Sequence, residues 1–550
     1  MAGVTRERYS YGKTVSERRA GVNSKGQDLK QRFEKRLAAI VAANSDALHG
    51  GLKGVEKESL RVAADGSLSM RPHPASLGSA LTNRYVTTDF SEALLEFVTP
   101  AFPTTWEALQ CICDIHQFTY SQLGDEMLWP ASMPCLIPDD DDIPLAQYGT
   151  SNVGRMKTVY RRGLGYRYGR QMQVIAGVHF NYSLPEGFWP VYREVLDSDL
   201  TIEAFRSDQY LGLIRNFRRF GWLVLYLFGS SPALCKSFSG AASASLKSLN
   251  ADSYFEPYAT SLRMSDLGYS NKNQSRIKIS LNSLDEYVRD LSSAICTPEP
   301  SYEEIGVKVD DEYRQLNANL LQIENEYYSP VRPKRVARSG EQPTAALRRD
   351  GIEYVEIRSL DINPFDPAGI NQNTMRFIEA LLIYCALEDS PKLNDKSLEE
   401  INSNHTGAAK RGRDPEFRLM RDGKAVTVAS WADEILSKVL AVAEVIDGCE
   451  KSDSYAQSVW LMQELVANVE ETPSARVLAD LEETRSSFFE YSLSLARSHS
   501  DYFGAITALD DARDQVFRKE VAESILRQQT IEASDEISLD EYLQRYFRNC

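Results

Sequence analysis

Several features that identify common protein classes are missing from this chain. It has no apolar run of about 18 residues and no secretory h-region, so neither a membrane span nor secretion is predicted. None of its eight cysteines forms C-x-x-C, and eight cysteines in 550 residues are an ordinary number for a protein of a reduced compartment. Basic residues (62) are outnumbered by acidic ones (78), and a net charge of −16 disfavours nucleic-acid binding. We predict a cytoplasmic protein without nucleic-acid, membrane or obligate protein partners.

The motifs of common nucleotide-binding and hydrolytic folds are also missing. G-x-x-x-x-G-K-[ST] does not occur, and the closest stretch, Gly149–Met156, lacks the Lys-Ser/Thr ending. The glycines at 163, 165 and 169 do not make G-x-G-x-x-G, and neither H-E-x-x-H nor G-x-S-x-G is found. P-loop, Rossmann and serine-hydrolase interpretations therefore have little support.

What is present is an ordinary globular composition, 43% hydrophobic and 25% charged over 550 residues, enough for two to four domain-sized units. Apolar spacing predicts helices over residues 31–48, 104–123, 205–228, 312–327, 371–388, 431–445, 457–469 and 478–495. Residues 135–152 are rich in Pro and Asp and are expected to form a loop. Short strand-like runs lie between these helices without regular βαβ alternation, which favours an α+β fold with an antiparallel sheet.

The first strand-like run that carries carboxylates is Val55–Val62. Side chains of a strand alternate between faces, so Glu56 and Glu58 share one face. Two adjacent carboxylates repel each other unless a cation lies between them, and Mg²⁺ prefers such oxygen ligands. The alternative is an edge strand with a solvated acidic face.

A second run, Thr87–Pro100, is more apolar and is expected to be largely buried. A buried carboxylate needs a cation or a hydrogen-bond donor, so Asp89 or Glu96 should meet one; a salt bridge to an arginine is the alternative. In a single continuous strand, Asp89 and Glu96 have opposite parity, and a bulge or bend would be needed for both to reach one metal.

Two further runs place polar residues on one strand face. Val178–Leu184 alternates apolar side chains with a polar row that begins at His179, either a ligand or a satisfied structural histidine. Ile352–Leu360 puts Glu356 and Arg358 on the same face, an arrangement that suits a metal beside a phosphate or, alternatively, a cross-strand ion pair.

The basic stretch Arg332–Arg338 stands out in so acidic a chain. Arg332 and Lys334 could clamp phosphate, and a solvated loop is the alternative. Taken together, these runs suggest several strands that direct Glu, Asp, His and Arg toward one cradle. Such a cradle would bind divalent metal on a sheet face and handle polyphosphate without a P-loop.

Several blocks of the sequence match the motifs of one family in order along the chain. They are Gly54–Arg61, Thr87–Phe90, Glu96–Phe97, Trp129–Cys135, Gln147–Asn152, Gly177–Asn181, Tyr258–Tyr269, Gln322–Glu326, Arg332–Arg335 and Glu353–Phe365. Through these blocks the chain resembles the glutamate–cysteine ligases of the proteobacterial type 1 family. The match is dense from about residue 50 to 370 and thin afterwards.

The resemblance implies a fold related to glutamine synthetase, with a curved antiparallel sheet as a cradle surrounded by helices. It implies that ATP phosphorylates the γ-carboxylate of L-glutamate and that the amine of L-cysteine then displaces phosphate to give γ-glutamylcysteine, the first step of glutathione biosynthesis. Mg²⁺, for which Mn²⁺ can substitute, would neutralise the phosphate charge. Feedback binding of glutathione is implied as well.

By position in the family motifs, the resemblance also assigns residues to roles. The implied metal ligands are Glu56, Glu58, Asp89, Glu96, His179 and Glu356. Arg358 is expected at the transferred phosphate, with Arg332 and Lys334 also binding ATP phosphates. The cysteine pocket is expected to contain Tyr160, Tyr269 and Tyr328. Arg263 is assigned to a substrate carboxylate and, with Arg358, to catalysis.

The domains follow from the same comparison. Residues 1–30 are interpreted as a flexible N-terminal extension, with a transit segment as the alternative; residues 31–400 as the catalytic domain; and residues 401–550 as a helical region packed on it. Some family members carry a disulfide from the position of Cys135 to a nearby cysteine. No cysteine lies between Cys135 and Cys235, so that bond is not expected here.

Two alternatives to the glutamate–cysteine ligase hypothesis remain open at this point. One is a ligase of the same superfamily with another acceptor amine. The other is a catalytically silent relative that binds nucleotide, although the intact acidic set speaks against it.

Overall fold

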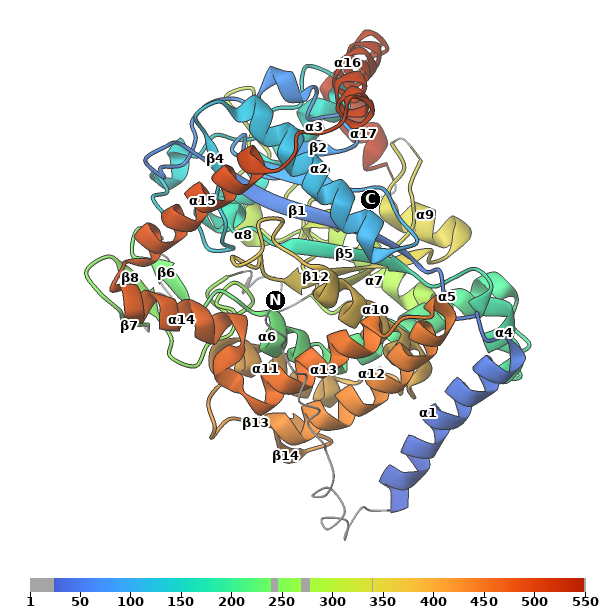
Figure 1. Cartoon of the computed structure of the whole chain (residues 1–550). Coiled ribbons are helices and arrows are strands. Elements are labelled where there is room, and N and C mark those ends of the chain that lie inside the picture. Colours follow the sequence, from blue (N-terminus) through green and yellow to red (C-terminus); the bar gives the residue numbers. More distant parts are fainter. Residues whose placement is uncertain (1–23, 239–245, 269–276, 339, 549–550) are drawn as a thin grey trace.

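The computed structural model describes residues 24–238, 246–268, 277–338 and 340–548 and shows helices around a central sheet (Figure 1). The sheet has seven strands in the order β11-β12-β5-β1-β3-β2, with β4 paired to β1, and every pairing is antiparallel. The strands are β1 (Leu52–Val62), β2 (Val86–Thr88), β3 (Leu94–Val98), β4 (Met127–Leu128), β5 (Val178–Ser183), β11 (Val331–Lys334) and β12 (Tyr354–Leu360). The expected α+β fold with an antiparallel sheet is confirmed.

The other elements surround this sheet. The α-helices are α1 (Ser24–Ala43), α2 (Thr105–Leu123), α3 (Asn152–Tyr168), α4 (Phe188–Val195), α5 (Ile202–Phe220), α6 (Trp222–Phe228), α7 (Leu284–Cys296), α8 (Pro300–Glu303), α9 (Pro343–Asp350), α10 (Gln372–Leu387), α11 (Asp395–Arg411), α12 (Val428–Glu450), α13 (Ser454–Ala467), α14 (Pro473–Thr484), α15 (Phe488–Ala505), α16 (Asp511–Ala533) and α17 (Leu539–Tyr546). The small sheets contain β6 (Ala233–Cys235), β7 (Lys247–Ser248), β8 (Ser253–Phe255), β9 (Lys308–Val309), β10 (Glu312–Tyr313), β13 (Arg418–Arg421) and β14 (Lys424–Thr427).

The two faces of β1 lie in different surroundings because its side chains alternate. Lys53 and Lys57 point toward the helices, where the Lys53 Nζ lies 2.9 Å from the Glu379 carboxylate of α10 and the Lys57 Nζ lies 2.8 Å from His116 Nε2 of α2. Both lysines are almost fully buried. The glutamates between and beyond them occupy the opposite face, which is therefore free to form a polar site.

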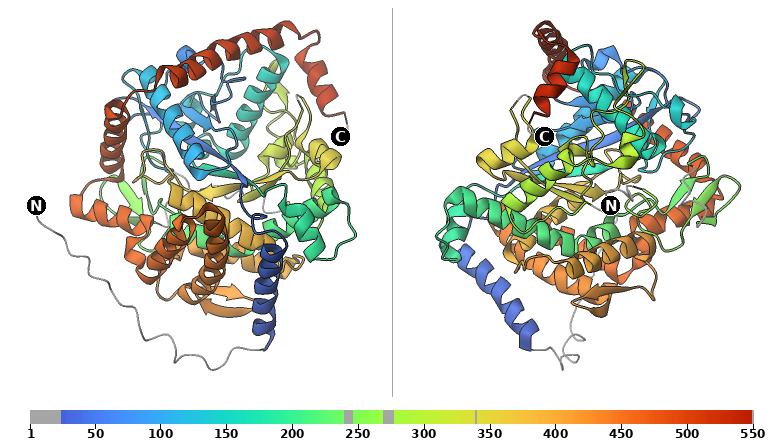
Figure 2. Two further views of the ribbon diagram at one scale, coloured as in Figure 1. Left: turned by 45° about the vertical axis from the view of Figure 1, so that its right-hand side comes forward. Right: turned by 180° about the vertical axis from the view of Figure 1, so that it is seen from behind.

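The C-terminal half of the chain packs on both sides of the sheet region. Helices α10, α12 and α13 contact one another in one layer, and α15 crosses over α2 (Figure 1). Helix α16 then runs along the far edge of the molecule and leads to α17, which packs on α3 (Figure 2). The last described helix thus returns to a helix of the N-terminal third.

Most of the predicted helices are present, with two corrections. The stretch predicted as one helix over 205–228 is two, α5 and α6, separated at Gly221. The stretch 478–495 likewise spans α14 and α15, because Arg485 adopts a left-handed conformation (φ 54°) that ends α14. In both places the apolar period continues across the break, so periodicity alone does not reveal it.

The helix predicted over 312–327 is wrong. This segment contains the short strand β10 and then turns that end in a 3₁₀ turn at Glu324–Glu326. Side chains replace the helical hydrogen-bond ladder: Gln322 Oε1 accepts from the Leu316 backbone N–H at 3.0 Å, and Asn317 Nδ2 donates to the Gln322 carbonyl at 2.9 Å. Amide side chains that bond to nearby backbone in this way stabilise turns.

The run 87–100, expected as one strand, is a hairpin of β2 and β3. The backbone N–H of Asp89 donates to the carbonyl of Leu94 at 2.9 Å and closes the turn between the strands. Asp89 therefore follows the end of β2, whereas Glu96 lies within β3. The parity conflict between these two carboxylates disappears because they do not share a continuous strand.

Cys135 forms a disulfide with Cys235 of β6, with Cα atoms 5.5 Å apart. The expectation concerned only a bond to a nearby cysteine, and the partner of Cys135 is instead 100 residues away in the sequence. The link joins the Trp129–Cys135 loop to the sheet formed by β6, β7 and β8.

Within the described ranges, no helix combines the length and the apolar character needed to cross a membrane.

Candidate active site

A cavity of about 690 Å³ lies over the face of the sheet that carries the glutamates of β1. All six residues expected as metal ligands line it, as do Arg358, Arg332, Lys334, Tyr160 and Tyr328. The sequence therefore predicted most of the charged lining. Side chains from the hairpin, α3, the segment 323–343 and α17 complete the walls.

The pairing of the strands explains why these side chains meet. Glu58 of β1 lies opposite Glu96 of β3, and Glu56 lies opposite His179 of β5. Near the other edge of the sheet, on the same face, Arg332 of β11 lies opposite Glu356 of β12. Residues directly opposite in an antiparallel sheet have neighbouring side chains on the same face. The register alone thus assembles one row of acids, an imidazole and a guanidinium.

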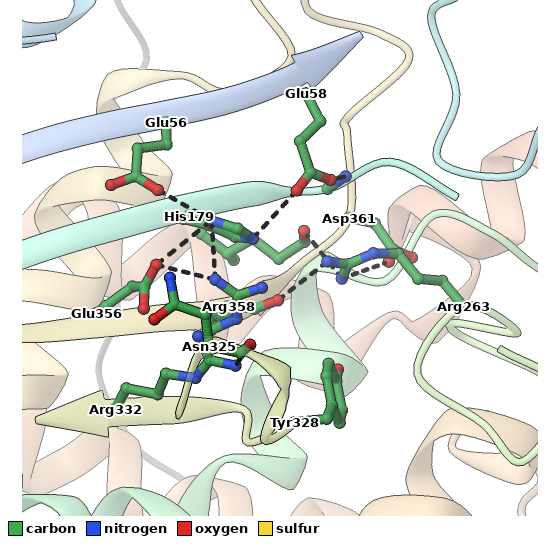
Figure 3. Close-up of polar contacts among 12 residues, drawn as sticks. Glu56, Glu58, His179, Arg263, Asn325, Tyr328, Arg332, Glu356, Arg358 and Asp361 are labelled. Carbon is green, nitrogen blue, oxygen red and sulfur yellow. Dashed lines mark hydrogen bonds and ion pairs between the residues drawn. The ribbon is translucent and has the colours of Figure 1, made fainter. Parts of the chain in front are cut away.

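His179 stands at the centre of this row (Figure 3). Its Nδ1 atom lies 3.1 Å from Glu56 Oε2 and 3.6 Å from Glu356 Oε1, and its Nε2 atom lies 3.6 Å from Glu58 Oε1. The imidazole is 4% exposed. His179 is thus a buried side chain surrounded by carboxylates, and it lines the cavity.

Carboxylates crowd the part of the cavity between β1 and the hairpin. Burial, followed by repulsion from Glu56, Asp89 and Glu58, raises the pKa of Glu96 well above its ordinary value. Burial likewise raises the pKa of Glu58, against the attraction of His179. A cation placed among these carboxylates would relieve their mutual repulsion.

The donor atoms in this region fit a divalent cation. One ligand atom each of Glu56, Glu96 and His179 lies within 4.8 Å of the others. Glu56 is oriented by Asn181, whose Nδ2 donates to Glu56 Oε1 at 2.8 Å, and the Gly177 backbone N–H donates to Glu58 Oε2 at 2.7 Å. Supporting hydrogen bonds of this kind orient metal-binding carboxylates.

Cations gather at the other end of the row. Glu356 Oε1 lies 2.9 Å from an Arg358 guanidinium nitrogen, and Glu356 Oε2 lies 3.4 Å from Lys334 Nζ. Burial would raise the pKa of Glu356, but Lys334, Arg358 and His179 together hold it well below the usual range. Glu356 therefore remains ionised and fixes two cations that face the cavity.

One face of α3 forms a wall of the cavity. Ser151 caps the helix by accepting from the Gly154 backbone N–H, and lining residues recur at helical spacing from Val153 to Tyr168. Among them, Arg161 donates to the backbone carbonyl of Asp89 and so ties α3 to the hairpin turn. Tyr160 is held in the same wall, where Gln322 Nε2 donates to its carbonyl at 3.2 Å.

One of the predicted residues, Arg263, lies outside the lining of the cavity. Its guanidinium, 1% exposed, donates to the carbonyls of Arg358 at 3.0 Å and Leu360 at 3.3 Å. It therefore lies beside the end of β12 and supports the backbone of that strand at Arg358 (Figure 3). Tyr269 lies outside the described residues. Tyr328, at the same end, contacts Met264 through its hydroxyl at 3.1 Å.

Sequence reasoning missed several lining residues. Lys157 and Arg161 are one turn apart in α3, and their spacing on either side of Tyr160, after a Ser151 cap, was a usable signal. Tyr542 and Tyr546 of α17 also line the cavity. No local pattern near residue 540 distinguishes these tyrosines from those of any amphipathic helix.

Comparison with known proteins agrees with this architecture. A model of the glutamate–cysteine ligase family matches residues 37–407. A glutamate–cysteine ligase of Alcanivorax borkumensis is 47% identical over 523 residues, which cover 94% of this chain and 99% of the relative. A glutamate–cysteine ligase of Pseudomonas putida is 46% identical over 511 residues, which cover 93% of this chain and 97% of that relative.

Solved structures lead to the same family. The crystal structure of a Francisella tularensis glutamate–cysteine ligase in complex with AMP matches with a TM-score of 0.86 at 35% identity, over 91% of this chain and 98% of that one. A bifunctional glutathione synthetase from Pasteurella multocida shares the fold, with a TM-score of 0.67 at 23% identity. The chain therefore belongs to the glutamate–cysteine ligase family and is a ligase, as its motifs predicted.

Proposed function

We propose that this ligase joins the γ-carboxylate of L-glutamate to the amine of L-cysteine at the expense of ATP, with the acidic cradle as its magnesium site. The observation that carries the proposal is the convergence of six potential ligands and three cations on one cavity of a family member. The reaction needs both groups, because it moves a highly charged phosphoryl group onto a second anion.

The cations of β11 and β12 have a clear use in the first half of the reaction. The bond from the terminal phosphorus of ATP to its bridging oxygen breaks, ADP leaves, and a glutamate γ-carboxylate oxygen forms a new bond to that phosphorus. Arg358 and Lys334 are held by Glu356 and face the cavity, where they can meet phosphate oxygens. The Nε atom of Arg332 is buried without a hydrogen-bond partner in the described structure, and so it has a donor to offer.

The carboxylates have the complementary role. Glu56, Glu58, Asp89, Glu96 and Glu356, with His179, would hold Mg²⁺, and Mn²⁺ shares the preference for carboxylate oxygens. The bound cation would neutralise phosphate charge during transfer. The raised pKa of Glu96 supports this role, because its repulsion by neighbouring carboxylates is relieved when a cation lies among them.

In the second half of the reaction, the cysteine amine attacks the γ-acyl carbon. A C–N bond forms, the C–O bond to phosphate breaks, inorganic phosphate leaves, and the amine loses a proton. Tyr160 and Tyr328 line the cavity and are half-buried, so they can help to exclude water from the acyl phosphate. We assign them to the acceptor pocket, with Tyr269 as its third expected member.

Glutathione contains the γ-glutamylcysteine unit, and we propose that it competes for this same cavity. A rise in the apparent KM for glutamate with added glutathione, at constant kcat, is the expected result. An effect on kcat alone would place glutathione at another site.

The decisive experiment measures ADP release with ATP, Mg²⁺ and glutamate, with and without cysteine, while γ-glutamylcysteine is followed by mass. Cysteine-dependent ADP release matched by dipeptide is the expected result. ADP release without dipeptide, followed by a screen of other amines, would indicate a different acceptor. If a folded protein released no ADP and made no dipeptide, the proposed ligase activity would be refuted.

A further inference from the structure

The cavity has a wall that the family motifs do not account for. Tyr542 and Tyr546 of α17 line it, and among the described lining residues they alone come from beyond Arg358. They are one helical turn apart and therefore lie on the same face of α17. Both side chains are half-buried.

Helix α17 is held firmly against the rest of the site. Its Leu539 and Leu543 are buried in an apolar cluster with Met156 and Val159 of α3. At the start of the helix, the Asp540 carboxylate accepts from the Tyr313 hydroxyl at 2.7 Å and lies 3.3 Å from Lys308 Nζ. At its end, Gln342 Nε2 donates to the Tyr546 carbonyl at 3.0 Å.

The segment before α17 is anchored to the beginning of α3. The Asn152 backbone N–H donates to the Asp535 carboxylate at 2.5 Å, and Asn152 Nδ2 donates to the Ile537 carbonyl at 2.9 Å. Helix α3 carries Tyr160 and Lys157 into the cavity. The position of the two tyrosines is therefore coupled to the rest of the lining at both ends of α17.

Part of the cavity lining is apolar. The charged row described above lies on the sheet, and Lys157, Arg161 and Glu341 add charges outside it. An apolar portion is formed by Val153, Met156, Ile323, Pro343, Tyr542 and Tyr546. Glutamate and cysteine are small and carry charged ammonium and carboxylate groups, so neither has a flat apolar face that would match this wall. Among the three substrates, only ATP has one, which is its adenine base.

The course of the chain connects this wall to the phosphate-facing cations. Strand β11 carries Arg332 and Lys334, and the chain then continues to Glu341 and Pro343, which line the cavity beside α17. The hydrogen bond from Gln342 to Tyr546 joins this segment to the tyrosine helix. A nucleotide with its phosphates on β11 would therefore direct its base toward α17.

We infer that Tyr542 and Tyr546 bind the adenine base of ATP by stacking, so that α17 is the base-binding wall of the active site. The inference rests on the proposed use of ATP at this site. Stacking on an aromatic side chain needs only the flat face of the base. It is strong enough that the loss of one ring weakens binding by about tenfold. The tyrosines act on nucleotide affinity rather than on the transferred phosphoryl group.

Calorimetric titration of the full-length protein with Mg²⁺ and adenylyl imidodiphosphate, an ATP analogue that is not hydrolysed, tests this inference. Tyr546→Ala and Tyr542→Ala are each expected to weaken analogue binding about tenfold. Tyr546→Phe, which keeps the ring, should retain affinity. Trp460→Ala, at an aromatic side chain 44% exposed on α13, is the matched control and should change nothing.

Inorganic tripolyphosphate, titrated in the same way, separates the base from the phosphates. It should bind the unsubstituted protein and both alanine variants equally, because it has no base. Equal losses for tripolyphosphate and analogue, or no loss for either, would overturn the inference. If thermal melting shows that an alanine variant does not fold, Tyr546→Leu, which keeps an apolar side chain against α3, takes its place with the same expectation.

The ligase proposal and this inference can fail separately. A protein that binds the analogue but makes no dipeptide refutes the ligase proposal, while the variants still test the wall. Steady-state assays add a second readout. In the alanine variants the KM for ATP should rise, while kcat and the KM values for glutamate and cysteine should stay unchanged. A rise in the KM for cysteine instead would assign the wall to the acceptor and overturn the inference, and absence of nucleotide binding would overturn both.

Discussion

Removal of one cradle carboxylate should make the metal-free protein more stable and abolish its stabilisation by magnesium. Glu96 is the best position, because burial and three neighbouring carboxylates raise its pKa well above the ordinary value of 4.5. The folded state therefore holds a proton more tightly than the unfolded state. The free energy of unfolding contributed by this group is fully present below about pH 4.5 and is lost as pH rises through the folded pKa.

The magnitude of the magnesium effect follows from linkage. A ligand at 100 times its Kd stabilises the folded state by about 2.7 kcal/mol. For 550 residues, an unfolding entropy of about 2.1 cal/mol/K per residue corresponds to about 1.2 kcal/mol/K for the chain. Saturating Mg²⁺ should therefore raise the Tm of the unsubstituted protein by about 2 °C.

Differential scanning calorimetry at pH 7.5 (about three pH units above the ordinary carboxyl pKa), with EDTA or with Mg²⁺, measures both effects. Glu96→Gln should melt above the unsubstituted protein in EDTA and show little magnesium-dependent shift. Glu444→Gln removes an exposed carboxylate of α12 and is the control for a change in net charge. A Glu96→Gln variant that kept the full magnesium shift, or melted lower in EDTA, would refute the reasoning about the cradle.

Three further predictions concern other parts of the molecule. Glu56→Gln should lower kcat about 100-fold or more while the far-ultraviolet circular dichroism stays unchanged; an unaltered rate would remove Glu56 from the metal set. Burial lowers the pKa of Lys57 from 10.5 to about 7, so the unfolded state binds more protons between these values and stability should rise with pH across that window. Lys57→Met should flatten the rise in urea titrations at several pH values, and a parallel profile would contradict the assignment. Asp540→Asn should loosen α17 and raise the KM for ATP several-fold with kcat retained, whereas a loss confined to kcat would argue against α17 as a base-binding wall.

The strands of the cradle could be predicted because alternation is a strong local signal. In β5, polar residues alternate with apolar ones, and in β12 Glu356 and Arg358 alternate with Val355 and Ile357. In β1 both faces carry charged side chains, and only the shared parity of Glu56 and Glu58 assigns these two residues to one face. The metal-ligand candidates of these strands then followed from the chemistry of carboxylates on one face. The resemblance to the family added Asp89 and Glu96, which parity alone had separated.

The remaining features depend on contacts between distant residues. The hairpin turn after Asp89 contains no Gly, Pro or Asn, so its composition marks the reversal of the chain only through Asp89 and Ser91. The polar segment 312–327 looked helical, yet Gln322 and Asn317 bond to backbone and keep it irregular. Tyr546 reaches the cavity only because Leu543 and its neighbours pack on α3. Such packing is a property of the folded chain and leaves no periodic trace.

The position of α17 along the chain also sets the order in which the active site is built during synthesis. Every strand of the central sheet, and with it every charged residue of the cradle, precedes residue 361, whereas the tyrosine wall follows residue 538. At about 5–20 residues per second, a ribosome needs on the order of tens of seconds to make the intervening chain. For that interval the growing chain has its charged cradle but not its last wall, so a polypeptide released early would have the acidic strands and no surface to receive the base.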